Sequence, residues 1–167
     1  MEQVLNPQPS WATKEGLVAL RGPDSQSLPG QAADKILAAE TLHRFGFAYD
    51  EQNAEAMTDC FTEDAVLTAT TAGTRSLGTH TGREAVVGWL SAHWGQSRDQ
   101  RRHIVTNAMV DDLTADSAQV TTMLLVTAAE NGQFRPVTAG VYRATVRKES
   151  DGAWRIARFA LGFDASF

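Results

Sequence analysis

The chain of 167 residues has a single cysteine, Cys60, so it cannot form an internal disulfide and gives no sign of an oxidising compartment. It contains no apolar run near the roughly 20 residues that a membrane-spanning helix needs. The first residues lack the basic segment followed by an apolar segment that marks a signal peptide. These absences predict a cytoplasmic protein.

Positive charge is also scarce, with 15 lysines and arginines against 20 aspartates and glutamates, a net charge of −5 and a pI of about 5.3. An acidic balance argues against nucleic acid or an anionic membrane as the main partner. The basic residues are scattered, and the run Arg101-Arg102-His103 is too short to form a binding patch. We therefore expect a small molecule as the ligand.

The motifs that bind cofactors are missing as well. There is no GxGxxG or GxxxxGK[ST] loop for a nucleotide, and no GxSxG elbow for a serine nucleophile. The four histidines (His43, His80, His93 and His103) lack the close spacing of metal ligands. Cys60 has no basic neighbour that would activate its thiol. The sequence thus predicts neither a metal nor a nucleotide cofactor.

Residues 1–30 differ from the rest because they hold four of the five prolines and show little periodicity. We expect an irregular N-terminal arm, and a single domain over residues 31–167. Trp11, Leu17, Val18 and Leu20 can dock this arm on the body, on a partner subunit or over a pocket. A loosely ordered tail is the alternative.

The first half of the domain has helical periodicity. We expect a helix from Gln31 to about Gln52 and a short one over Asn53–Cys60. A turn at Thr62–Asp64 and a strand over Ala65–Thr70 should follow, and 71–82 has the turn formers of a hairpin or loop. Thr81 and Glu84 form a capping box, which predicts a third helix running to about Trp94.

The second half is strand-like over 100–112, 117–130, 135–149 and 153–164, with turn residues between the strands. Long neighbouring strands joined by short turns form an antiparallel meander. The predicted fold class is α+β, with helices gathered on one face of a curved sheet. Such a sheet forms a cone that encloses a pocket.

Two polar residues interrupt the apolar side of the first helix. The apolar arc holds Ala39, Leu42, Phe45, Tyr49, Ile36 and Phe47, and it also includes His43 and Asp50. A buried carboxylate is costly unless it is paired or functional. Asp50 either binds His43 or a strand hydroxyl for structural reasons, or orients a histidine or acts as a base. The phenol of Tyr49 also needs a partner, and a substrate carbonyl is one candidate.

On the strand 100–112, alternation places His103, Val105, Asn107 and Met109 on one face. His103 can act as an acid or base near neutral pH, and a carboxylate partner would fix its tautomer. Asn107 either donates to a substrate oxygen or packs against a neighbouring strand. The side chains expected to supply apolar walls are Trp89, Phe47, Met109, Met123, Phe159 and Phe163.

Four segments together resemble the SnoaL-like branch of the nuclear-transport-factor-2-like superfamily. They are FAYDEQNAEAMTDCFTEDAVL (47–67), GTHTGREAVVGWL (78–90), RRHIVTNAMV (101–110) and GVYRATVRKESDGAWRIARFAL (140–161). The resemblance implies a cone-shaped curved antiparallel sheet wrapped by three N-terminal helices. It says less about activity, because this fold hosts dehydratases, ring cyclases, isomerases, epoxide hydrolases and non-catalytic subunits.

The pair Tyr49-Asp50 and the histidine of RHIVTN, His103, resemble positions of the scytalone dehydratases. The resemblance implies acid–base removal of water from a small oxygenated ring, without metal or cofactor. Those enzymes use a second histidine, for which His43 and His80 are both candidates here.

We therefore expect a cofactor-independent dehydratase, cyclase or isomerase that acts on a small hydrophobic oxygenated secondary metabolite, and we expect a homodimer. Catalysis is assigned to His103, Asp50 and Tyr49. Substrate binding is assigned to Asn107, Trp89, Phe47, Met109, Met123, His43 and Phe163. The alternatives are a non-catalytic subunit or ligand-binding module of the same fold, and an epoxide-opening enzyme that uses Arg158 and Asp164.

Overall fold

The computed structural model describes residues 10–22, 30–96 and 98–165 of the chain. The helices are α1 (Trp11–Lys14), α2 (Gln31–Asp50), α3 (Ala54–Asp59), α4 (Arg83–Ser91) and the 3-10 helix Trp94–Gln96. The strands are β1 (Phe61–Thr71), β2 (Arg75–Thr81), β3 (Gln100–Asp111), β4 (Ser117–Glu130), β5 (Gln133–Lys148) and β6 (Trp154–Phe163). No described helix is both long enough and apolar enough to cross a membrane.

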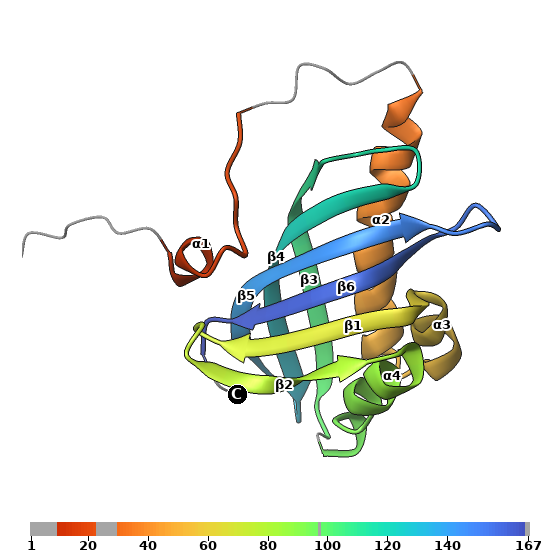
Figure 1. Cartoon of the computed structure of the whole chain (residues 1–167). Coiled ribbons are helices and arrows are strands. Elements are labelled where there is room, and N and C mark those ends of the chain that lie inside the picture. The colour runs from red at the N-terminus through yellow and green to blue at the C-terminus, as the bar shows by residue number, and fades with distance from the viewer. Residues whose placement is uncertain (1–9, 23–29, 97, 166–167) are drawn as a thin grey trace, which may run out of the picture.

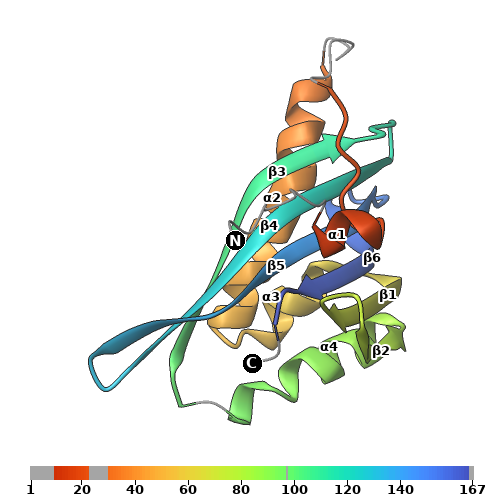
Figure 2. The same ribbon diagram turned by 90° about the vertical axis from the view of Figure 1, so that its left-hand side faces the viewer.

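The strands form one six-stranded sheet in the order β2-β1-β6-β5-β4-β3. It curls without closing, α2 lies behind it, and the β4–β5 hairpin projects beyond the rest of the sheet (Figures 1 and 2). The predicted α+β fold with a curved sheet is thus confirmed. One pairing differs from the prediction, because β1 runs parallel to β6 while every other pair is antiparallel.

The strand β1 is longer than expected. Its pairing with β6 starts at Phe61, opposite Ile156, and resumes at Val66, opposite Arg158. The residues between them, where the sequence predicts a turn, form an irregularity within the strand. A local insertion of this kind bends a strand without ending it, which is why the turn signal at Thr62–Asp64 was misleading.

The helices α3 and α4 begin in different ways. Asn53 caps α3, since its Oδ1 accepts a hydrogen bond from the Ala56 N–H at 2.9 Å. The capping box predicted for α4 is wrong. Its N-cap is Gly82, with a φ of 89° and no side-chain cap. The Gly82 N–H instead donates to the Ala65 carbonyl at 2.8 Å, which fastens α4 to β1.

The buried side of α2 differs from the predicted arc. Ile36 and Phe47, both placed in that arc, are 67% and 73% exposed. Apolar residues surround this helix, so periodicity alone could not select the packed side. Packing selects the side that carries Gly46, where an added Cβ would lie 3.5 Å from the His103 carbonyl oxygen. This close approach of α2 to β3 brings the end of α2 beside His103.

An aromatic cluster fills the core between α2 and the sheet. The rings of Phe45 and Phe159 meet edge to face with centroids 5.0 Å apart, and the rings of Tyr142 and Phe159 meet at the same separation. Phe61 packs against Phe45 at 5.7 Å. Edge-to-face contacts of this kind fix ring orientations as well as burying area. They give the cavity described below a rigid base.

Residues 10–22 of the N-terminal arm dock on the outer face of the sheet. The Trp11 Nε1–H donates to Asp164 Oδ1 at 2.6 Å, and Arg21 binds Asp112 at 2.6 Å. Trp11 and Leu17 cover Gly162, and an added Cβ there would lie 2.5 Å from the Trp11 ring. In Figure 2, β4 passes between α1 and α2. Of the alternatives considered for the arm, docking on the body holds for these residues, while 1–9 and 23–29 lie outside the described residues.

Candidate active site

A cavity of about 430 Å³ opens on the concave side of the sheet. Its walls come from α2, from α4 with the turn that follows it, and from all six strands. The lining residues are Phe45, Tyr49, Thr71, Arg75, Leu77, Trp89, Leu90, His93, Arg101, His103, Val126, Val137, Thr138, Tyr142, Leu161 and Phe163. A volume of this size, with apolar walls and a few polar groups, is typical of a small-molecule site.

Asp50 and His103 form a buried pair at the wall between α2 and β3. Asp50 Oδ1 lies 2.5 Å from His103 Nδ1, and Asp50 Oδ2 accepts the His103 backbone N–H at 2.7 Å. The two side chains are only 5% and 10% exposed. Because a carboxylate accepts, Nδ1 carries the proton, and Nε2 is the ring nitrogen without a partner among the described residues. The partner of Asp50 is therefore His103 and not His43.

Two tyrosines face the same cavity beside this pair. The Tyr49 ring meets the His103 ring at 4.8 Å between centroids, and Tyr142 is almost fully buried. Burial raises the pKa of both phenols; Arg101 acts in the opposite direction on Tyr49, and Asp50 adds to the rise in each. Both therefore stay neutral at physiological pH. Neither hydroxyl has a hydrogen-bond partner among the described residues, so both can donate to a ligand.

A second histidine, His93, also lines the cavity. Its Nδ1 lies 2.9 Å from the Trp89 carbonyl oxygen. A carbonyl only accepts, so Nδ1 is protonated and Nε2 is left for proton exchange. The sequence analysis named His43 and His80 as candidates for this role and missed His93. A signal was present, because His93 follows Trp89 by four residues, the spacing of side chains on one side of a helix; in the structure His93 lies in the turn just after α4.

His80 supports the wall without lining it. Its ring stacks on Trp89 at 4.7 Å between centroids with an interplanar angle of 25°. The His80 Nε2 is buried without a hydrogen-bond partner among the described residues. His43 is half-buried on α2 and does not line the cavity. The assignment of His43 to substrate binding is therefore corrected.

Asn107 lies outside the cavity, contrary to the prediction from strand alternation. The pairing of β3 with β4 breaks between Thr106 and Met109, and Asn107 has a φ of 54°. This bulge adds a residue and moves the positions after it to the opposite face. The Asn107 amide donates to the sulfur of Met123 on the outer face, at 3.5 Å.

Part of the predicted apolar wall also lies outside the cavity. Met109 pairs with Thr121 on the outer side of the sheet, and Met123 is 56% exposed there. Phe47 points to solvent from α2. None of these three lines the cavity, whereas Trp89 and Phe163 do. Phe159 packs in the core beneath it.

The described residues offer few other reactive groups. They contain no group of three or more histidine, cysteine, aspartate or glutamate side chains able to hold a metal ion. Cys60 is buried, and burial raises the pKa of its thiol to about 11, so the thiol is protonated at neutral pH. The polar groups that line the cavity are able to transfer protons and to form hydrogen bonds.

The sequence profile of the SnoaL-like domain matches residues 32–160. The chain belongs to this family. The match takes in Asp50, His93 and His103, and it leaves residues 10–22 of the arm outside. No curated protein sequence matches this SnoaL-like chain.

Solved structures share the fold at low identity. A nuclear-transport-factor-2-like protein with a cystatin-like fold from Novosphingobium aromaticivorans is 24% identical, with a TM-score of 0.66 over 86% of this chain and 94% of that one. The β subunit of a putative aromatic-ring-hydroxylating dioxygenase from the same organism is 16% identical, with a TM-score of 0.68 over 81% and 94%. A ketosteroid isomerase-like protein from Erwinia carotovora atroseptica is 17% identical, with a TM-score of 0.64 over 83% and 100%. These likenesses establish the nuclear-transport-factor-2-like fold.

Proposed function

We propose that this SnoaL-like protein is a cofactor-independent acid–base enzyme, a dehydratase, cyclase or isomerase of a small oxygenated molecule. The single observation that carries the proposal is the buried Asp50–His103 pair at the wall of an open cavity. A carboxylate that fixes a histidine tautomer is the arrangement of a general base and its orienting group.

Each polar group of the cavity has a role in this proposal. His103 Nε2 removes a proton from the carbon next to a carbonyl, and Asp50 stabilises the imidazolium that results. The neutral phenols of Tyr49 and Tyr142 donate to the carbonyl oxygen as negative charge develops on it. His93, once its Nε2 has taken up a second proton from solvent, delivers that proton to a leaving hydroxyl, which departs as water and completes a dehydration. Return of the first proton to another carbon gives an isomerisation instead.

The alternatives, a non-catalytic subunit and an epoxide-opening enzyme, have less support. A purely structural subunit would be expected to fill the space at His103 with core side chains, whereas a cavity opens there. The epoxide-opening alternative depends on Arg158 and Asp164 being at the site. Arg158 is exposed and does not line the cavity, and Asp164 binds Trp11 outside it. We therefore favour proton transfer.

The test is a metabolite comparison by mass spectrometry. Wild type, Asp50→Asn and His103→Ala are each incubated with a small-molecule extract of the source organism, in H2O and in D2O. We expect wild type alone to convert a compound, with loss of one water for a dehydration or no mass change for an isomerisation. Deuterium incorporation in D2O would report the proton transfer to carbon.

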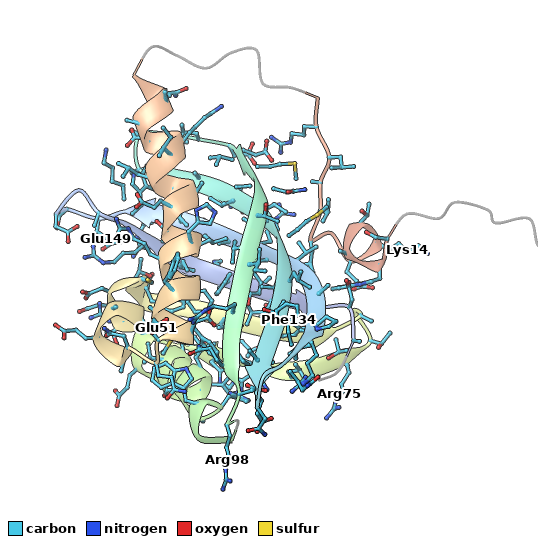
Figure 3. The ribbon with its side chains drawn as sticks, turned by 180° about the vertical axis from the view of Figure 1, so that it is seen from behind. Lys14, Glu51, Arg75, Arg98, Phe134 and Glu149 are labelled. Atoms are coloured by element: carbon cyan, nitrogen blue, oxygen red, sulfur yellow. The ribbon has the colours of Figure 1, made fainter. Side chains whose placement is uncertain are left out.

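The control is Glu51→Gln, which removes the neighbouring carboxylate. Glu51 is exposed just after α2 (Figure 3) and binds Arg102 at 3.1 Å. It should behave as wild type. Equal conversion by wild type, Asp50→Asn and His103→Ala would contradict the proposed mechanism.

We also propose a homodimer that forms through the outer face of the sheet. Ile104 and Leu125 lie directly opposite each other on β3 and β4, and Met123 lies beside them. All three are exposed apolar side chains on one face. Light scattering on a gel-filtration column should give twice the chain mass of 18.1 kDa, and Leu125→Glu should give the single mass. A monomeric wild type would contradict this assembly.

A further inference from the structure

The charge of the cavity is opposite to the charge of the chain. The sequence carries a net charge of −5, yet the residues that line the cavity include two arginines and two histidines and neither an aspartate nor a glutamate. Two carboxylates stand behind its wall, Asp50 against His103 and Asp99 against Arg101. A concave site with cationic lining concentrates positive potential where a ligand binds.

One of the two arginines is held in place by other protein groups. Arg101 Nε lies 3.1 Å from Asp99 Oδ1, and Arg135 lies 3.0 Å from Asp99 Oδ2. The Asp99 side chain is only 6% exposed. Two guanidinium groups share one carboxylate here, so the cluster keeps one net positive charge at the cavity. Arg101 is thus oriented but not neutralised.

The other arginine, Arg75, has no hydrogen-bond or ion-pair partner among the described residues. It begins β2 opposite Thr71 of β1, and both residues line the cavity. Arg75 is an exposed residue, and Figure 3 shows it at the rim of the molecule, at the edge of the sheet. A cationic side chain at the cavity without a protein anion can bind an anion of the ligand.

The turn that carries Arg75 is fixed from two sides. The Ala72 N–H donates to the Phe163 carbonyl at 2.6 Å, although Ala72 has the unfavourable φ of 47°. The aliphatic part of Glu15 in the arm lies against Gly73. The backbone that carries Arg75 is therefore set by the fold, so the side chain starts from a fixed point at the edge of the cavity.

The two edges of the curved sheet face the same cavity. Arg75 is on β2 at one edge, and His103 is on β3 at the other. Apolar side chains line the space between them, among them Trp89 and Phe163. A ligand that fills this space meets the proton-transfer groups at one end and Arg75 at the other.

We propose that Arg75 binds a carboxylate of the substrate, so that the substrate is an apolar oxygenated acid and not a neutral molecule. The inference rests on the proposed function, because it defines the substrate class of the same cavity. Binding of the carboxylate at one edge places the carbon that loses its proton near His103 at the other edge. Arg101 lies on the His103 side and adds to the attraction for a negatively charged ligand.

The test is binding of two fluorescent probes that differ by one charge. Dansylglycine has a carboxylate on an apolar aromatic body, and dansylamide has the same body without it. We expect wild type to bind dansylglycine more tightly, and Arg75→Gln to weaken that binding about tenfold. Arg75→Gln should change dansylamide binding by less than about twofold. Raised salt should weaken the binding of dansylglycine alone.

The matched control is Arg158→Gln, an exposed arginine of β6 that does not line the cavity. It should leave the binding of both probes unchanged. Equal affinity for the two probes, no binding of dansylglycine, or an equal loss of affinity in both variants would overturn the inference.

These binding measurements need no turnover, so they are independent of the proposed reaction. Conversion of a neutral metabolite by wild type but not by His103→Ala would overturn this inference alone, while charge-selective binding without any conversion would overturn only the proposed enzyme.

Discussion

Replacement of Asp50 by asparagine tests the Asp50–His103 pair with little change in shape. The carboxylate accepts two hydrogen bonds from the same residue, His103: one from its backbone N–H at 2.7 Å and one from its ring Nδ1–H at 2.5 Å. An amide has only one oxygen. If that oxygen keeps the backbone bond, the amide NH2 faces Nδ1 and can bind only a deprotonated Nδ1. The substitution should therefore move the ring proton to Nε2.

The expected loss of activity follows from this change of tautomer. With Nε2 protonated, His103 cannot accept a proton from the substrate, and the amide no longer stabilises an imidazolium charge. Correctly placed general bases contribute about 10²–10⁴-fold to rates, so kcat should fall by about that factor in Asp50→Asn. Both hydrogen bonds keep a partner, so the free energy of unfolding should change by less than about 2 kcal/mol.

Long-range proton–nitrogen NMR spectra of the histidine rings can read the tautomer directly. In wild type, His103 should show a protonated Nδ1, and in Asp50→Asn a protonated Nε2. A His103→Gln variant assigns the signals among the four histidines of the chain. An unprotonated Nδ1 in wild type, or an unchanged tautomer in Asp50→Asn, would refute the reasoning whatever the rate shows.

Three further predictions concern the tyrosines, the cysteine and the arm. Burial raises the pKa of Tyr49 and Tyr142, the chain's two tyrosines, above 10.0, so an absorbance titration should show less than half of the phenols ionised at pH 10 in the folded protein. Because the folded state then holds these protons more tightly than the unfolded chain, the free energy of unfolding should fall as the pH rises above 10. The Cys60 thiol, buried and with a pKa raised to about 11, should react with a thiol reagent at neutral pH only after denaturant is added. Gly162→Ala places a Cβ 2.5 Å from the Trp11 ring and should cost about 1–3 kcal/mol in urea unfolding, with faster proteolysis of the arm; unchanged stability and proteolysis would show that the arm does not need this contact.

The sequence by itself determined the strands of the second half and the two central residues of the site. Period-two alternation and turn residues identify β3 to β6 because each strand has an inner face that must be apolar. Asp50 stood out because a carboxylate among apolar residues needs a partner. His103 stood out because alternation placed it on an inner face, and no irregularity precedes it on β3.

Only the tertiary structure decided which residues accompany that pair. The bulge between Thr106 and Met109 turns Asn107 and Met109 outward. A bulge of this kind requires no particular residue type, so the sequence pattern does not predict its position. The packed side of α2 depends on the approach of Gly46 to β3, so Phe47 faces solvent although Leu42 and Phe45 of the same predicted arc are buried.

The same holds for the groups brought in from distant elements. His93 and Tyr142 reach the cavity because α4 and β5 close over it, which no local pattern specifies. Arg75 faces His103 across the cavity only because the sheet curls, bringing its two edge strands to one space. Local periodicity depends on each element's own neighbours in sequence, whereas the composition of a cavity depends on the curvature and packing of all the elements together.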